Sequence, residues 1–104
     1  MALIIKPTEE KKITILGTEI ELPSVYGRLE FAGRADGRTM EIAIANFASK
    51  EAFKANASQI STNVPVGSMQ VQIEENEMQT IEVAHKYAKL SLEQAGYEVE
   101  IDLI

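Results

Sequence analysis

Apolar and polar residues alternate along much of the chain in short stretches, which is the period of a β-strand with one buried face. The stretches that show it are both arms of 13–22, 25–33, 38–48, 69–73 and 97–103, and the apolar start, 1–7, is also read as a strand. The region 77–95 instead has the period of an amphipathic helix. We therefore predict an α+β fold: about six mostly antiparallel strands, one long C-terminal helix packed on the sheet, and one short helix.

The first pair of arms meets at Gly17-Thr18, and a glycine-first pair suits the type II′ turn of a two-residue hairpin. The register that this turn sets places Ile15 opposite Ile20, so that the apolar residues of both arms share one face. We predict a β-hairpin over 13–22.

The second pair of arms, 25–33 and 38–48, flanks Asp36-Gly37. Asp-Gly favours a type I′ turn, in which both central residues have a positive φ. The register then gives one continuous apolar face, formed by Gly33 opposite Met40, Phe31 opposite Ile42, and Leu29 opposite Ile44.

These arms are long, because a typical strand has ~5–6 residues. We expect the tip, which carries Arg34 and Arg38, to project beyond the sheet and to serve as a contact surface for other proteins.

Both helices have recognisable ends. Asn76 is the expected N-cap of the helix over 77–95, and Gly96 is its expected stop. Ser49 is expected to cap a short helix over Lys50–Asn56.

At ~100° per residue, the long helix has two apolar stripes. The first is rich in small residues and suits close packing on the sheet; it consists of Ile81, Ala84, Ala88, Leu92 and Ala95. The second stripe, Val83, Tyr87 and Leu90, lies roughly opposite. A helix on one sheet buries one stripe. The second stripe is therefore either covered by the 57–68 loop or the short helix, or it is a protein interface.

Length and composition are those of one folded domain, 1–104, with 45% hydrophobic and 25% charged residues. The chain has no cysteine, which excludes disulfides, thiolate metal sites and cysteine nucleophiles. No stretch approaches the ~20 apolar residues of a membrane helix, and the apolar start is too short for a signal peptide. We expect no membrane association.

The net charge of −6 is unevenly distributed along the chain. Acids and bases balance over 1–57, whereas 58–104 carry the whole excess of acid. An acidic protein repels phosphate backbones, so we expect no nucleic-acid binding. The asymmetry either favours head-to-tail contact between copies or only provides solubility.

Residues for catalysis are sparse. His85 is the only histidine, and we expect it on the helix surface, because no residue at triad or metal spacing accompanies it. The acids Glu98, Glu100 and Asp102 share one strand face, which we expect to be solvated. The sequence therefore predicts a non-enzymatic protein without a cofactor or bound metal.

The overall pattern resembles small structural proteins of tailed bacteriophages and phage-like particles. The run Val25–Phe31, Asp36-Gly37, the run Met40–Ile44 and the ending Leu92–Tyr97 carry the likeness. It is a likeness of architecture, from which no functional residue transfers. It implies a protein that assembles with itself or joins neighbouring parts.

The leading hypothesis is therefore a virion component, of a tail or a head–tail junction, that forms homo-oligomers or binds other assembly proteins. The second is a small acidic adaptor or inhibitor of a host protein in the bacterial cytoplasm. The third is a small enzyme or ligand-binding protein with an acidic pocket near His85. The expected location is the virion or the bacterial cytoplasm.

Overall fold

The structure, a computed structural model, describes residues 1–64, 69–74 and 76–103, and it confirms the α+β class. In the described part of the chain, five strands form one antiparallel sheet in the order β4-β3-β2-β1-β5. The strands are β1 (Ala2–Lys6), β2 (Val25–Gly33), β3 (Thr39–Phe47), β4 (Met69–Gln72) and β5 (Glu98–Asp102). The helices are α1 (Lys50–Lys54) and α2 (Ile81–Gln94). Part of the predicted 57–68 loop, residues 65–68, lies outside the described residues.

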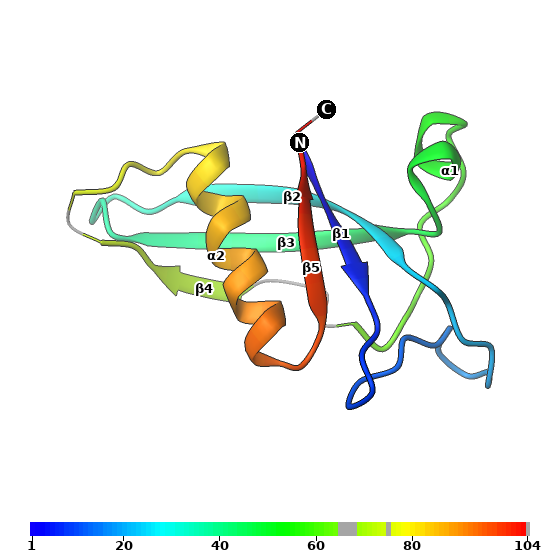
Figure 1. Cartoon of the computed structure of the whole chain (residues 1–104). Coiled ribbons are helices and arrows are strands. Elements are labelled where there is room, and N and C mark those ends of the chain that lie inside the picture. Colours follow the sequence, from blue (N-terminus) through cyan, green and yellow to red (C-terminus); the bar gives the residue numbers. More distant parts are fainter. Residues whose placement is uncertain (65–68, 75, 104) are drawn as a thin grey trace.

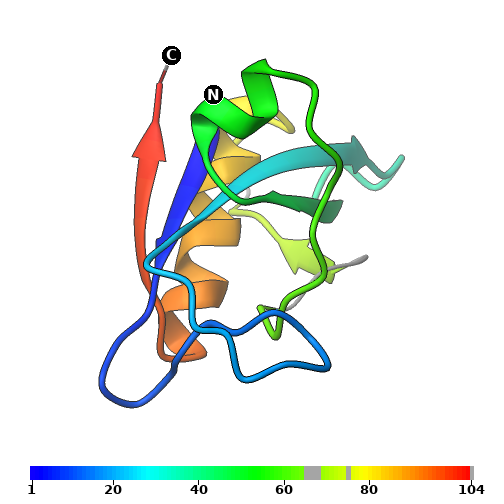
Figure 2. The same cartoon turned by 90° about the vertical axis from the view of Figure 1, so that its right-hand side faces the viewer.

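The sheet is curled, and α2 lies against its concave side (Figures 1 and 2). Strands β2 and β3 run across the molecule, whereas β1 and β5 cross them steeply (Figure 1). The change of direction is possible because β1 pairs with β2 only over Val25–Gly27, the first part of β2. The rest of β2 pairs with β3 alone, so the β2–β3 hairpin extends to one side of the molecule.

The register predicted for this hairpin is confirmed: Gly33 pairs with Met40, Phe31 with Ile42 and Leu29 with Ile44.

The predicted type I′ turn of this hairpin is wrong, because Gly37 has a positive φ of 75° and Asp36 does not. The Asp36 carboxylate instead accepts hydrogen bonds from the backbone N–H groups of Arg38 and Thr39 and from the Thr39 hydroxyl. These bonds stabilise the wider turn.

The segment 13–22 has the predicted register but does not form strands. Ile15 N–H donates to Ile20 O, and Leu22 N–H donates to Ile13 O, yet the only ladder contacts described are isolated bridges. The turn also differs from type II′. Thr18 N–H donates to Ile15 O, so Gly17, with φ 80°, is the third residue of the turn. The sheet therefore has five strands rather than about six.

The main helix starts later than predicted. Its N-cap is Thr80, whose hydroxyl accepts from Val83 N–H, and Asn76 is not the cap. The reason lies in the preceding residues, where Glu77 N–H donates to Glu74 O and so forms a separate turn. The predicted stop is confirmed: Gly96 has φ 106°, Gly96 N–H donates to Glu93 O, and Tyr97 N–H donates to Leu92 O. These two bonds form a Schellman motif.

The main core lies between α2 and the concave face of the sheet. The helix buries Ala84, Ala88 and Leu92 there. The sheet and its connections contribute large apolar side chains: Leu3, Ile5, Ile13, Val25, Met40, Ile42, Ile44, Val64, Ile73, Tyr97 and Val99. Fully burying one such aliphatic side chain stabilises the fold by about 1.5–3 kcal/mol.

His85 belongs to this buried face, so the prediction of a surface histidine is wrong. It is 1% exposed. Its Nδ1 lies 2.7 Å from the Ile81 carbonyl oxygen, and its Nε2 is buried without a hydrogen-bond partner among the described residues. His85 therefore packs on the buried face of α2, together with Ala84, Ala88 and Leu92.

The short helix α1 packs on the opposite face of the sheet. Ser49 caps it as predicted, accepting from Ala52 N–H, and it ends at Lys54 rather than Asn56. Phe53 packs against the rings of Tyr26 and Phe47 in a second, small core. Because α1 lies on this face, it does not cover the second stripe of α2.

Candidate interaction surfaces

The tip of the β2–β3 hairpin positions both predicted contact arginines. Arg34 forms an exposed ion pair with Glu41 of β3. Arg38 is also exposed, and its backbone oxygen accepts a hydrogen bond from Ile73 N–H. Hydrogen bonds from Arg38 and Thr39 to its carboxylate lower the pKa of Asp36 below its usual value. The backbone that carries both arginines is therefore fixed by hydrogen bonds.

Gln79 joins this tip to the start of α2. Its side-chain amide donates to the backbone oxygens of Arg34 (2.9 Å) and Thr39 (3.0 Å). A Cβ at Gly33 would lie 2.5 Å from this amide group, so the absence of a side chain lets Gln79 approach the strand. The strand lengths had suggested that the tip projects alone beyond the sheet. Instead, the hairpin is held against the segment before α2.

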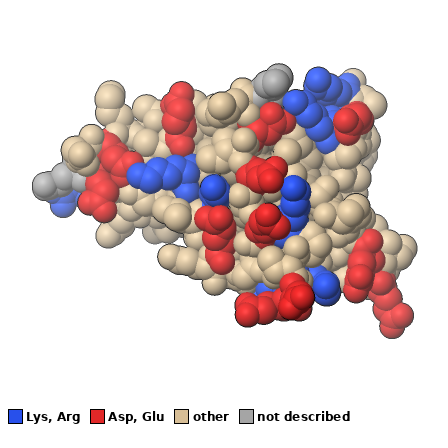
Figure 3. All heavy atoms as spheres, viewed as in Figure 1, with Lys and Arg blue, Asp and Glu red and all other residues tan. Residues whose placement is uncertain are grey.

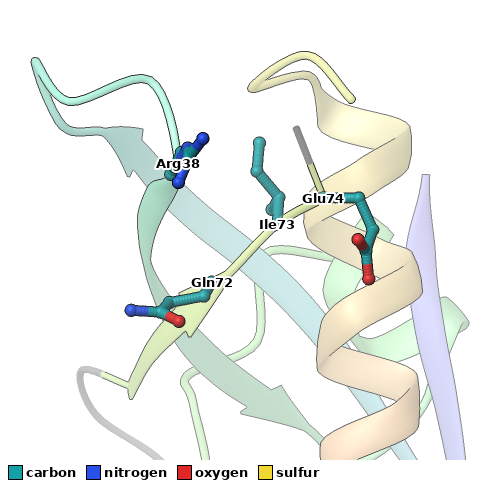
Figure 4. Close-up of a pocket in the computed structure, with 4 residues that line it drawn as sticks. All are labelled: Arg38, Gln72, Ile73 and Glu74. Atoms are coloured by element: carbon teal, nitrogen blue, oxygen red, sulfur yellow. The ribbon is translucent and has the colours of Figure 1, made fainter. Parts of the chain in front are cut away.

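A hollow of about 310 Å³ lies beside this junction and is lined by Arg38, Gln72, Ile73 and Glu74 (Figure 4). One cation and one carboxylate border it. Arg38 projects from the tip side, and Glu74 leaves the end of β4 toward α2 (Figure 4).

Exposed large apolar residues lie close to Gln79 along the chain. Met78 immediately precedes it and is 75% exposed, and Ile81, the first residue of α2, is 43% exposed. Phe31 is 36% exposed and lies on the same face of β2 as Gly33, the residue beneath Gln79. We call these three residues, with Arg34 and Arg38, the tip surface.

The second stripe of α2 divides into two parts. Val83 and Tyr87 are half-buried and pack against the main core. Leu90 is 44% exposed. Of the three residues of this stripe, Leu90 is therefore the most accessible to another protein.

Tyr87 has a polar partner that the sequence pattern did not indicate. Its hydroxyl donates to Glu77, which also forms an ion pair with Lys86 at 2.8 Å. Hydrogen bonds from Lys86 and Tyr87 lower the pKa of Glu77 from 4.5 to about 2. The same carboxylate raises the pKa values of Lys86 and Tyr87. This cluster attaches the segment before α2 to the middle of the helix.

The uneven charge along the sequence is not kept in space. Acids of the C-terminal half pair with bases of the N-terminal half: Lys6 with Glu100 at 3.2 Å, and Lys50 with Asp102 at 3.0 Å. Figure 3 shows both signs interleaved on one face of the molecule. The fold therefore does not separate an acidic end from a basic one on this face.

Two of the contacts that shape these surfaces, those of Glu77 and Gln79, were missed at the sequence level. Both residues lie within the range predicted as helix, and the sequence pattern indicated no partner for either side chain. The later start of α2 frees them to reach Tyr87 and Arg34 instead.

Neither described helix is long and apolar enough to cross a membrane. Comparisons with protein-family models, curated proteins and solved structures found no match.

Proposed function

We propose that this protein is a non-enzymatic assembly component of a phage virion, of its tail or head–tail junction, and that it acts through protein–protein contacts. Its partners are other copies of the chain or neighbouring assembly proteins. The residues of the tip surface carry this proposal: exposed apolar side chains on β2 and at the start of α2, and Arg34 and Arg38 at the turn of the hairpin. Leu90 on α2 is the second contact residue.

The composition of the tip surface supports a contact role. Aromatic residues, methionine and arginine are enriched in protein interfaces, and the tip surface contains Phe31, Met78 and both arginines. Large apolar side chains grouped on an exposed surface mark interaction sites more often than single ones do. The hydrogen bonds of Asp36 and Gln79 fix the backbone of this region, which lowers the entropy lost when it binds.

The test replaces apolar contact residues by charges and measures molar mass in solution by light scattering. The variant Met78→Glu/Ile81→Glu should dissociate the wild-type oligomer to a smaller species, because two carboxylates would be buried in the contact. The matched control is Leu16→Glu/Ile20→Glu, which changes two apolar residues of the segment 13–22, each 57% exposed.

The control should keep the wild-type mass, and circular dichroism should show that both variants are folded. Equal loss of mass in both variants would refute a specific tip contact. A folded wild-type monomer at all concentrations would exclude self-assembly and favour an adaptor that binds a foreign protein.

A further inference from the structure

The two edge strands of the sheet differ in whether their side chains would oppose pairing with a strand of another molecule. In the described part of the chain, β4 and β5 each have a neighbouring strand on one side only (Figure 1). An edge strand presents unpaired backbone groups that can pair with another chain, and proteins commonly block such edges with charged residues. Short edge strands are also less prone to pairing, but β4 and β5 have four and five residues, so the charge of their side chains is what distinguishes the two edges.

The β5 edge repels a copy of itself. Glu98, Glu100 and Asp102 lie on one face of β5 and alternate with Val99 and Ile101. In antiparallel self-pairing, opposite residues share a face, so the registers centred on β5 place Glu98 or Glu100 opposite another acid. Like charges directly opposite one another are destabilising. Glu100 and Asp102 each pair with one lysine, Lys6 and Lys50, which lessens this repulsion without removing it.

The β4 edge has no such block. Its sequence, Met69–Gln72, contains no charged residue. The amide of Gln70 donates to Glu41, whose carboxylate is already paired with Arg34. On the other face, Met69 and Val71 are only half-buried against the main core. Self-pairing would place amides beside amides and apolar side chains beside apolar ones.

Strand direction distinguishes a two-fold contact from a head-to-tail one. Because five antiparallel strands alternate in direction, β4 and β5 run the same way. Joining β5 of one copy to β4 of the next, with both helices on one face, makes a parallel pair. A two-fold axis between two β4 strands makes an antiparallel pair, whose hydrogen bonds are the more stable, and it closes as a dimer.

We propose that β4 pairs antiparallel with β4 of a second copy of this chain, so that one sheet continues across a two-fold dimer. The inference rests on the proposed function, because it names the strand through which copies associate. It assigns the tip surface to contacts between such dimers or with other assembly proteins.

Cross-linking tests the pairing directly, since the chain has no cysteine and one introduced thiol has no competitor. Gln70→Cys and Val71→Cys each place a thiol opposite its copy in one of the two registers centred on β4. We expect one of them to form a disulfide-linked dimer under mild oxidation. Glu100→Cys on β5 is the control and should remain uncross-linked. Equal cross-linking of Glu100→Cys would overturn the assignment to β4.

A blocked edge provides the second test. Gln70→Lys/Gln72→Lys places like charges opposite one another across the pair, and both residues are exposed, so the subunit should fold unchanged. We expect the mass to fall below that of the wild type, because the β4-linked dimer no longer forms. If the mass of this variant is unchanged while Met78→Glu/Ile81→Glu reduces it, the β4 pairing is wrong and the proposed function stands. A wild type that is monomeric at every concentration would refute the β4 pairing and self-assembly through the tip surface.

Discussion

At the scale of single residues, the carboxylate of Glu77 connects Glu74, which follows β4, with the middle of α2. It accepts from the Tyr87 hydroxyl, from Lys86 and from Glu74 N–H. These partners stabilise the ionised form, which is why its pKa falls to about 2. Folding therefore favours an ionised Glu77 over the neutral acid.

A pH dependence of stability follows. The pKa of Glu77 is lower in the folded than in the unfolded chain. The stabilisation that ionised Glu77 gives the folded state is therefore present in full above its ordinary pKa of 4.5. The contribution is lost as the pH falls toward 2. Urea unfolding should show a smaller fall in the free energy of unfolding over this range for Glu77→Gln than for wild type.

The matched control for this experiment is Glu98→Gln, which replaces an exposed glutamate of β5. The free energy of unfolding of Glu98→Gln should fall with decreasing pH as steeply as that of the wild type. Parallel curves for wild type and Glu77→Gln would show that the cluster does not form in solution.

Single residues also show what the sequence could and could not reveal. His85 precedes Leu92 by seven residues, so at ~100° per residue the two project about 20° apart, and this geometry could have placed the histidine in the core. The half-burial of Val83 and Tyr87 could not be read in this way. It depends on tertiary packing and on Glu77, neither of which has a local signal.

At the scale of elements, the end of α2 depends on Gly96. A residue with a side chain at φ 106° is strained, and a Cβ there would lie 2.7 Å from Lys11 Cγ. Gly96→Ala should destabilise the protein by about 1–2 kcal/mol from backbone strain alone, with the contact adding to it. Thermal or urea unfolding measures this loss.

Two companion variants separate the causes. Gly17→Ala introduces a side chain at φ 80° with no atom within 4 Å, so it should show the backbone strain without the contact. In the Lys11→Ala background, Gly96→Ala should cost less than in wild type. A Gly96→Ala variant as stable as wild type would mean that the Schellman motif does not terminate the helix.

Registers were predictable from the sequence, but turns and strand extents were not. Alternation of side chains sets which residues face one another, so both hairpin registers follow from the positions of the apolar residues. The turn types depend on side chains that bond to the backbone, as Asp36 does. Segment 13–22 does not form strands of the main sheet, because its backbone hydrogen bonds with other segments go to residues 61–63 instead.

At the scale of the whole molecule, the fold redistributes charge. The acidic excess of residues 58–104 meets lysines from the first half of the chain at Glu100 and Asp102. Sequence position therefore did not predict the charge of each end. The strand order, which places β1 between β2 and β5, brings these partners together and had no local signal.

Association between copies is the central claim, and the molar mass of the unmodified protein tests it most directly. Light scattering from low to high micromolar concentration should give a defined oligomer, an even multiple of the 11.5 kDa chain, that dissociates on dilution. A mass of one chain at every concentration would contradict self-assembly, the β4 pairing and the role of the tip surface in joining copies.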